Sequence, residues 1–360
     1  MKKIDVAILG TNFGQKIHRP ALESLGNVQV TALYHRSLAT AQAMAKDSGL
    51  RAFDSVTGAI ASVQAVAIST PPFAHFEMAK AAIEAGKPVF LEKPITLTAP
   101  EGRVLYRLAQ EKKVAVAVDF EFRFIPAWLR LKELLEENYV GRLRYVKIDW
   151  LGASRADSDR AWNWYAQKEM GGGTLGSIGS HAFDYIHWLF GPSRRLSARL
   201  STVILSRPDG AVRRPVTSDD VCNITLEQAD GTPIQVCLSA VTNQGRGHFV
   251  EIYGDRGTLA LGNPSQTDYI HGFTLMGRQG SGELDRLEVP DRLAFSQTFG
   301  DGRIAPIARV MERWVANFGS PGDLVPGLRE GVYAQLLMDC CQDSNLSGRW
   351  VEIPELEAFL

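Results

Sequence analysis

Two segments of the chain carry side chains that could perform acid–base or electrostatic chemistry. The first is GGGTLGSIGSH, residues 171–181, which consists mostly of small residues and ends in His181. An imidazole is a suitable proton acceptor near neutral pH. The alternative is a histidine that caps a loop or is satisfied within the core. The apolar residues after Thr174 are spaced as on one face of a helix. On that helix Ser177 and His181 are four residues apart, and His181 and Asp184 are three apart, so each pair can share a face.

The second segment is Leu91-Glu92-Lys93-Pro94, which ends a short apolar run. In parallel α/β sheets, ligands bind at the carboxyl ends of the strands. Pro94 restricts the residue before it to an extended or turn geometry. We therefore expect Lys93 to hold its ammonium group beside a bound ligand.

A turn near the N-terminus has features of a nucleotide-binding loop. In VAILGTNFGQKIH an apolar run ends at Gly10, and a helix can begin shortly afterwards. Asn12 tolerates positive φ better than most residues, and Gly14 leaves room for a ligand. The first amides of the helix can then face a pyrophosphate. The full fingerprint would have glycines at Asn12 and Gln15, so a plain strand-to-helix turn is the alternative. The predicted cofactor contacts in this turn are Gly10, Asn12, Phe13 and Gly14.

The end of the next apolar run indicates which dinucleotide binds. NAD sites usually place an acidic residue there to bind the ribose hydroxyls, but residues 24–46 contain no Asp or Glu. The run ends instead in His35-Arg36-Ser37. A guanidinium and a hydroxyl can bind a 2′-phosphate, and His35 can add a ring contact. The sequence therefore favours NADP(H), with NAD(H) possible. The alternative is that Arg36 is a solvated loop charge.

The first third of the chain alternates short apolar runs with helical segments. This pattern predicts a parallel sheet covered by helices on both faces, as in doubly wound α/β domains. We assign this domain to residues 1–122. The predicted strands are 4–9, 28–34, 65–69, 88–91 and 114–118, and predicted helices include 38–48 and 76–85.

After residue 123 the pattern changes to alternating segments without intervening helices. Such alternation predicts a large, open, mostly antiparallel sheet with one covered face, in an α+β domain of residues 123–360. The other face could be a subunit interface, so we expect a homodimer or homotetramer. Residues 263–297 are polar and glycine-rich and receive no assignment. The predicted strands are 143–151, 195–206, 221–228, 234–241, 248–253 and 258–261, between helices 126–138 and 328–344.

In their order, these motifs resemble the glucose-fructose oxidoreductase / inositol dehydrogenase / rhizopine catabolism (Gfo/Idh/MocA) family. The resemblance extends from Ile4 to about Pro354. It implies an N-terminal Rossmann domain and a C-terminal domain that binds substrate and forms oligomers. It also implies an NAD(P)-dependent dehydrogenase or reductase of a sugar, cyclitol or related polyol or carbonyl compound. The matching segments are the glycine turn, STPPFAH at 69–75, LEKP at 91–94, DFEFRFIPAW at 119–128, GGGTLGSIGSH and EIYGDRG at 251–257.

The resemblance implies roles for individual residues. His181 would accept the hydroxyl proton as a hydride moves to the nicotinamide, and Lys93 would hold the substrate oxygen and stabilise charge on it. Pro94 is expected to follow a cis peptide bond, which is frequent in the family. The residues implied to line the cofactor are Thr70, Pro71, His75, Glu92 and Lys93, and Arg123 is implied to lie near the substrate.

The chain departs from the family pattern at two positions. Ser177 stands where most members have Asp, and Glu121 where many have an amide. A serine can hydrogen-bond but holds no charge, so Ser177 could orient His181 or relay a proton on the substrate side. This departure keeps two alternatives open: a non-catalytic NADP-binding regulatory protein, like a galactose repressor related to the family, and an NAD-dependent inositol-type dehydrogenase.

An aromatic segment precedes the glycines. Trp162 and Trp164 could stack on a sugar ring, and Asn163 could bind a hydroxyl. The alternative is that these residues pack a loop onto the sheet.

The composition limits the partners. The 360 residues are 45% hydrophobic with a net charge of −1 and no basic stripe, so we expect no nucleic-acid partner. No apolar run approaches the ~20 residues of a membrane span. The four cysteines lack zinc-site spacing. We therefore expect no bound metal. We expect the cysteines to be buried free thiols, as in a reducing cytoplasmic environment. The family resemblance implies a small sugar or polyol as substrate.

Overall fold

The chain forms two compact units in a computed structural model, which describes residues 3–46, 48–265, 267–268, 270–319 and 324–360. Unit 1 comprises Met1–Glu121, Gln297–Gln335 and Phe359–Leu360. Unit 2 comprises Phe122–Ser296 and Leu336–Ala358. Unit 1 therefore combines the N-terminal part of the chain with a segment from near its C-terminus.

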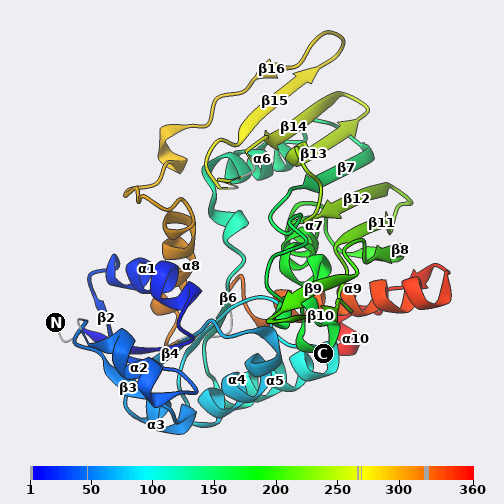
Figure 1. The fold of residues 1–360 in the computed structure, drawn as a ribbon. Helices are drawn as coiled ribbons and strands as arrows, with labels where there is room; N and C mark the ends of the chain where they lie inside the picture. Colours follow the sequence, from blue (N-terminus) through cyan, green and yellow to red (C-terminus); the bar gives the residue numbers. More distant parts are fainter. Residues whose placement is uncertain (1–2, 47, 266, 269, 320–323) are drawn as a thin grey trace. The chain divides into compact units, whose positions relative to one another are not determined.

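Unit 1 contains a parallel sheet. Its strands are β1 (Ile4–Leu9), β2 (Val28–Tyr34), β3 (Arg51–Phe53), β4 (Ala65–Ile68), β5 (Val89–Leu91) and β6 (Val116–Val118). In the described residues the order is β3-β2-β1-β4-β5-β6 (Figure 1). The order reverses between β1 and β4, which is the point where ligands bind in doubly wound sheets. Every residue of β4, β5 and β6 is buried, as expected for strands covered on both faces. The predicted parallel sheet is confirmed, with β3 as an additional strand.

Helices cover both faces of this sheet. Helix α8 packs against α1 and β6, whereas α4 packs against α3 and α5 on the other face (Figure 1). Of the predicted helix 38–48, α2 forms the first part, and residue 47 lies outside the described residues. The helical elements are η1 (Gly14–His18), α1 (Arg19–Glu23), α2 (Leu38–Ala45), α3 (Val56–Ala61), η2 (Pro72–Ala74), α4 (His75–Glu84), α5 (Ala99–Lys112) and α8 (Ile304–Ala316). Three further elements extend across the limits of the units: η3 (Glu121–Phe124), α9 (Leu328–Ser347) and α10 (Leu356–Phe359).

Unit 2 contains a large mixed sheet. In the described residues its order is β16-β15-β14-β13-β7-β12-β11-β8-β17, and only the β7–β12 pair is parallel. The prediction of a mostly antiparallel sheet is confirmed. The strands are β7 (Leu143–Leu151), β8 (Ser193–Ser201), β11 (Val221–Gln228), β12 (Pro233–Ser239), β13 (Gly247–Gly254), β14 (Gly257–Asn263), β15 (Thr274–Gln279), β16 (Asp285–Arg286) and β17 (Val351–Glu352).

Two predictions for unit 2 need correction. The predicted strand 195–206 is two elements, because β8 ends at Ser201 and a separate hairpin of β9 (Ser206–Asp209) and β10 (Val212–Pro215) follows. The chain leaves the sheet here because the carboxylate of Asp220 accepts hydrogen bonds from the amides of residues 203 and 204. The unassigned region 263–297 contains β15, β16 and η7 (Asp291–Leu293), and residues 266 and 269 within it lie outside the described residues.

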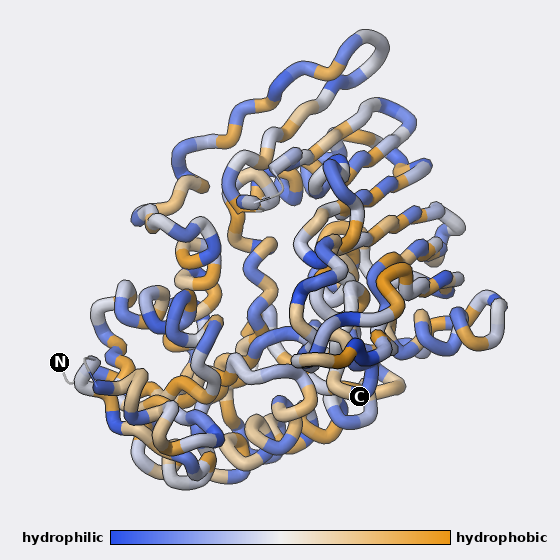
Figure 2. The backbone as a smooth tube through the Cα atoms, viewed as in Figure 1, coloured by the Kyte–Doolittle hydropathy of each residue, from blue (hydrophilic) through white to orange (hydrophobic). Residues whose placement is uncertain are grey.

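One face of the unit 2 sheet is covered by helices. The elements α6 (Pro126–Glu136), η6 (Leu175–Gly179) and α7 (Ser180–Phe190) lie on this side, with α6 against β14 and β15 and η6 against β12. Hydrophobic and hydrophilic residues alternate along the strands (Figure 2), and on β11 the buried set is Cys222, Ile224 and Leu226. On the other face, Tyr145 stacks on Tyr253 with ring centroids 6.0 Å apart.

No helix in the described part of the chain has the length and hydrophobicity that a bilayer crossing requires. All four cysteines are free, as predicted. Cys222, Cys340 and Cys341 are buried, but Cys237 is half-buried and so departs from the prediction.

Candidate functional site

The predicted nucleotide turn lies at the switch point of the unit 1 sheet. Gly10 follows β1 with φ 128°, and a Cβ there would lie 2.7 Å from Ser69, which follows the neighbouring strand β4. Only glycine fits this close approach. The Phe13 ring packs edge-on to His18 (5.4 Å between centroids) and lies under Arg303. Together these contacts place the first turn of η1 at the carboxyl edge of the sheet.

The residues after β2 leave one cation available. The amide of Ser37 donates to Nδ1 of His35 (3.0 Å), and the Ser37 hydroxyl caps α2 by accepting from the Thr40 amide (3.4 Å). Arg36 between them is exposed. Among the described residues, no hydrogen bond or ion pair engages its guanidinium group. This loop therefore offers a cation and no acidic residue at the carboxyl end of β2.

His75 connects two loops at the same edge. Its Nε2 lies 2.7 Å from the carbonyl oxygen of Thr70, and its Nδ1 lies 2.8 Å from that of Pro94. The residue is 1% exposed. Burial lowers the pKa of His75, while the two carbonyl oxygens oppose this shift. The His75 ring thus links the loop after β4 to the loop after β5 by hydrogen bonds.

The lysine turn follows β5 directly. The Glu92 amide donates to the carbonyl oxygen of Ile68 (3.0 Å) and so fixes the start of the turn against β4. The Lys93–Pro94 peptide bond is cis, as the family resemblance led us to expect. Lys93 is half-buried. The residue comes shortly after the end of β5, so its backbone lies at the carboxyl edge of the sheet.

A buried cluster beside this turn was not predicted. Nε2 of His18 lies 2.9 Å from Oε1 of Glu92 and 3.5 Å from Oδ2 of Asp119. All three residues are buried, and Glu121 nearby is 3% exposed. One signal was available in the sequence, because Glu92 and Asp119 directly follow the adjacent strands β5 and β6. His18 is distant from both in the sequence, and only the fold brings it to them.

The surroundings of the cluster shift the pKa values of its carboxyl groups in opposite directions. Burial opposes ionisation of Glu92, but its hydrogen bond with His18 and the nearby charges lower its pKa to about 2. Burial, with the charge of Glu92, raises the pKa of Asp119 well above its usual range. Burial and the charge of Asp119 do the same for Glu121. The positive charge of Lys93 favours ionisation of all three carboxyl groups.

A cation could bind in this cluster, because one ligand atom from each of three residues lies within 4.8 Å of the others. The three residues are His18, Glu92 and Asp119. However, His18 and Glu92 already form a direct hydrogen bond. Hydrogen bonding accounts for this arrangement, and the absence of a bound metal stays a prediction.

In unit 2, two of the three glycines, Gly172 and Gly173, closely approach other residues of the same unit. A Cβ at Gly172 would collide with the carbonyl oxygen of Tyr165, and one at Gly173 would lie 2.8 Å from Oδ1 of Asp219. Asp219 also accepts a hydrogen bond from the Leu175 amide (2.7 Å) and so holds the start of η6. These contacts fix the helix that carries His181.

His181 lies in an aromatic environment. It is 4% exposed, and its ring packs edge-on to Phe122 (5.1 Å) and at a tilt to Trp150 (6.2 Å). η6 is a π-helical segment that ends two residues before His181, and such segments are frequent at functional sites. The hydroxyl of Ser177 lies 2.9 Å from the phenolic oxygen of Tyr165, a partner that was not predicted.

Arg123, predicted to contact substrate, forms a buried ion pair. Its guanidinium group donates three hydrogen bonds of 2.6 to 3.1 Å to the carboxylate of Asp184 on α7. Arg123 is 7% and Asp184 2% exposed. Asp184 is therefore engaged within unit 2 and is unsuited to replace the carboxylate missing at Ser177.

The aromatic segment before the glycines is held by local contacts. The indole nitrogen of Trp162 donates to the carbonyl oxygen of Pro215 (3.1 Å), and Arg214 lies over its ring. Asn163 accepts a hydrogen bond from the Tyr165 amide (2.9 Å) and caps η4 (Trp164–Ala166). These local contacts fix the conformation of the segment without a ligand. Its stacking on a sugar ring stays a prediction.

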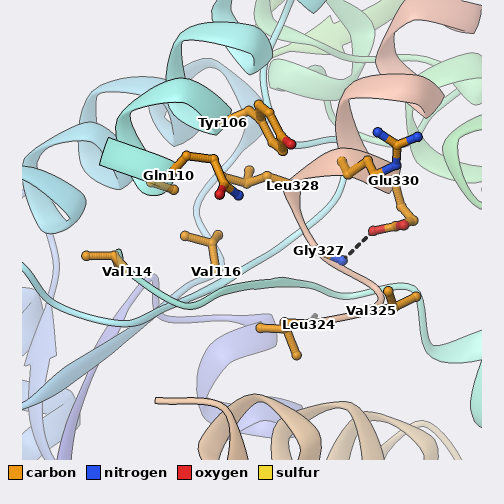
Figure 3. Close-up of a pocket in the computed structure, with 11 residues that line it drawn as sticks. Tyr106, Gln110, Val114, Val116, Leu324, Val325, Gly327, Leu328 and Glu330 are labelled. Atoms are coloured by element: carbon orange, nitrogen blue, oxygen red, sulfur yellow. Dashed lines mark hydrogen bonds between the residues drawn. The ribbon is translucent and has the colours of Figure 1, made fainter. Parts of the chain in front are cut away.

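A small pocket of about 90 Å³ lies elsewhere in unit 1, between α5 and the start of α9 (Figure 3). Tyr106 and Gln110 line one side of it, and Glu330 accepts a hydrogen bond from the Gly327 amide (2.8 Å). Val116, another lining residue, begins β6. The pocket therefore lies at the amino end of the strand, opposite the edge where doubly wound sheets bind ligands.

Comparison with known proteins assigns both parts of the chain. The NAD-binding Rossmann model of an oxidoreductase family matches residues 4–120, and the C-terminal α/β model of the same family matches residues 132–353. An uncharacterized oxidoreductase of Synechocystis sp. is 47% identical, covering 99% of this chain and 98% of that protein. Levoglucosan dehydrogenase of Pseudarthrobacter phenanthrenivorans is 27% identical over 82% of this chain and 81% of its own length. A solved structure of levoglucosan dehydrogenase in complex with NADH and L-sorbose has the same fold, with a TM-score of 0.87 and 24% identity, and the match covers 99% of this chain and 100% of that chain.

Proposed function

Because the chain belongs to the Gfo/Idh/MocA oxidoreductase family and is a dehydrogenase acting on CH–OH groups, we propose that it transfers a hydride between NADP(H) and a sugar, cyclitol or related polyol. The observation that carries this proposal is the position of Lys93. The lysine directly follows β5 on a cis-proline turn, at the edge of the sheet where a dinucleotide binds. Relatives named as levoglucosan dehydrogenases support a sugar-like substrate.

We assign the chemical roles to two residues. In the oxidative direction the imidazole of His181 accepts the hydroxyl proton, while the C–H bond breaks with its electron pair and the carbinol becomes a carbonyl. Bound NADP⁺ supplies the hydride acceptor. The ammonium group of Lys93 donates a hydrogen bond to the substrate oxygen and stabilises its developing negative charge.

The choice of NADP(H) rests on the loop after β2. Arg36 is exposed, has no acidic partner among the described residues, and follows directly on the strand. A guanidinium group here would form charge-assisted hydrogen bonds with a 2′-phosphate. The turn at Gly10, whose backbone allows no side chain, would hold the pyrophosphate.

We also propose a division of labour between the units. The Rossmann part, residues 1–122, binds the cofactor, and the part from residue 123 onward binds substrate and forms a homodimer or homotetramer. The uncovered sheet face supports the oligomer, because it presents stacked tyrosines, of which Tyr253 is 37% exposed.

The proposal is tested by a substrate panel. Sugars, aldoses and cyclitols are assayed with NADP⁺ and NAD⁺ by nicotinamide absorbance, using the wild-type protein and Lys93→Ala. We expect turnover of at least one sugar or cyclitol, faster with NADP⁺, that Lys93→Ala abolishes. Tight NADPH binding without any turnover would instead indicate a regulatory protein of the same fold.

A further inference from the structure

A group of three arginines in unit 2 has no acidic partner among the residues that the structure describes. The guanidinium carbon of Arg155 lies 3.8 Å from the ring centroid of Tyr165. Arg207 donates to the carbonyl oxygens of Arg155 and Asp157 (both 2.6 Å), and Arg160 donates to a main-chain carbonyl in the same loop (2.8 Å). Among the described residues, none of the three forms an ion pair with a carboxylate. Arg155, Arg160 and Arg207 together form an arginine cluster.

The carboxylates near this cluster bind main-chain amides instead. Asp219 accepts one such hydrogen bond (2.7 Å), Asp220 accepts two (2.7 and 2.9 Å), and Asp157 accepts one (2.9 Å). By contrast, Arg213 and Arg214 on the adjacent β10 each pair with a carboxylate (2.9 and 2.7 Å). The lack of a partner is therefore a property of the cluster and not of all arginines in this region.

The cluster carries an electrostatic cost. Burial, with the charges of neighbouring arginines, lowers the pKa of both Arg155 and Arg207. Arginine nevertheless stays protonated in proteins, so the positive charges remain close together. Buried charges are normally paired, yet the buried guanidinium group of Arg207 donates only to main-chain carbonyl oxygens.

The cluster is connected to the helix that carries His181. Arg155 stacks on Tyr165, and the Tyr165 phenol contacts the Ser177 hydroxyl (2.9 Å). Ser177 precedes His181 by four residues on one continuous helical segment. Arg155, Tyr165 and Ser177 are only partly buried, so each keeps some solvent-accessible surface.

We propose that the arginine cluster binds an anionic group, phosphate or carboxylate, of the sugar substrate. Arg155 provides the main contact, and Arg207 holds the Arg155 loop in place and adds its charge. The anion would bind on one side of Tyr165, with the reacting carbinol on the side of Ser177 and His181. This inference rests on the proposed dehydrogenase function and names its substrate class.

The test compares matched ligands that differ in charge. Binding of glucose, glucose 6-phosphate, glucuronate and inorganic phosphate is measured by calorimetry in the presence of saturating NADPH, which occupies the Arg36 loop. We expect glucose 6-phosphate or glucuronate to bind at least about tenfold more tightly than glucose, as one charge-assisted hydrogen bond allows. Tighter binding of glucose 6-phosphate identifies the recognised anion as phosphate, and tighter binding of glucuronate identifies it as carboxylate.

Variants then locate the effect. Arg155→Gln should remove the preference for the charged ligand, and Arg155→Lys should keep part of it, because a point charge replaces a planar fork. Arg194→Gln, which removes an exposed cation from β8 in the same unit, should change nothing. Arg207→Gln serves as a second variant only if it folds, since Arg207 supports the loop.

The outcomes separate the two claims. Equal affinity for glucose and its charged counterparts, or a preference unchanged in Arg155→Gln, overturns the anion site. Turnover of neutral sugars in that case leaves the proposed function standing. Binding of anionic sugars that depends on Arg155 but without turnover supports the anion site and refutes the dehydrogenase proposal.

Discussion

His18 and Glu92 form a buried hydrogen bond of 2.9 Å that links the helix after the nucleotide turn to the lysine turn. Asp119 lies 3.5 Å from the same nitrogen of His18. Two carboxyl groups thus share one imidazole immediately beside Lys93, and only Glu92 is stabilised as the anion. The arrangement keeps one negative charge at this edge of the sheet next to the ammonium group.

This arrangement predicts how stability depends on pH. The folded-state pKa of Asp119 is raised from its usual 3.8, so folding takes up a proton and the free energy of unfolding falls as pH rises above 3.8. Asp119→Asn removes that titration and should flatten the decline at higher pH. Urea unfolding of both proteins at a series of pH values measures this decline. Parallel curves for the wild type and Asp119→Asn would refute the raised pKa of Asp119.

Glu92 supplies the opposite control. Its pKa is lowered from 4.5 to about 2, so its contribution to stability is complete above pH 4.5 and is lost as pH falls toward 2. Glu92→Gln should therefore weaken the acid-side loss of stability. It should also reduce the decline above pH 3.8, because the charge of Glu92 helps to raise the pKa of Asp119. Asp119→Asn should affect only the decline above pH 3.8, and this difference separates the two variants from a general loss of folding.

The cofactor preference is predicted to depend on Arg36. Arg36→Ala should weaken NADPH binding by about tenfold or more, because charge-assisted hydrogen bonds to the 2′-phosphate are lost, and should leave NADH binding unchanged. Quenching of tryptophan fluorescence measures both affinities. Lys46→Ala removes an exposed cation just after α2 and is the matched control. Equal effects on NADPH and NADH would mean that Arg36 does not recognise the phosphate.

Much of the fold followed from the sequence, because hydrophobic patterns directly encode local structure. The bounds of β1, β2, β7 and β11 agree with the predicted runs. Helix α5 was missed although Thr98 and Glu101 form a capping box, a signal that the sequence contains. Non-local relationships were inaccessible, since no local pattern specifies the parallel pairing of β7 with β12 or the packing of α8 in unit 1.

The same distinction holds for the candidate site. Lys93 and His181 could be singled out by motif, and the cis bond before Pro94 by family resemblance. The partners of Arg123 and Ser177 required the fold, because Asp184 and Tyr165 are brought to them by tertiary packing. A motif identifies which groups are present, whereas the structure determines which of them are already occupied.

The pair of Arg123 and Asp184 leads to a stability prediction. Arg123→Ala leaves a buried carboxylate without its cation and should cost about 3–5 kcal/mol of unfolding free energy. Arg123→Lys should be intermediate, because a lysine cannot form the bidentate contact. Replacing both residues with Met and Leu should restore most of the loss. If Arg123→Ala is stable and only KM rises, Arg123 acts as the predicted substrate contact instead.

The role of His181 as proton acceptor is the central claim, and the pH dependence of kcat tests it most directly. The measurement compares wild type and His181→Gln with the best substrate of the panel, after calorimetry has verified that NADPH affinity is unchanged. We predict that His181→Gln lowers kcat by about 10²–10⁴-fold, the usual contribution of a general base, and removes the acid limb of the wild-type profile. A variant with undiminished kcat and the same pH profile would contradict the account.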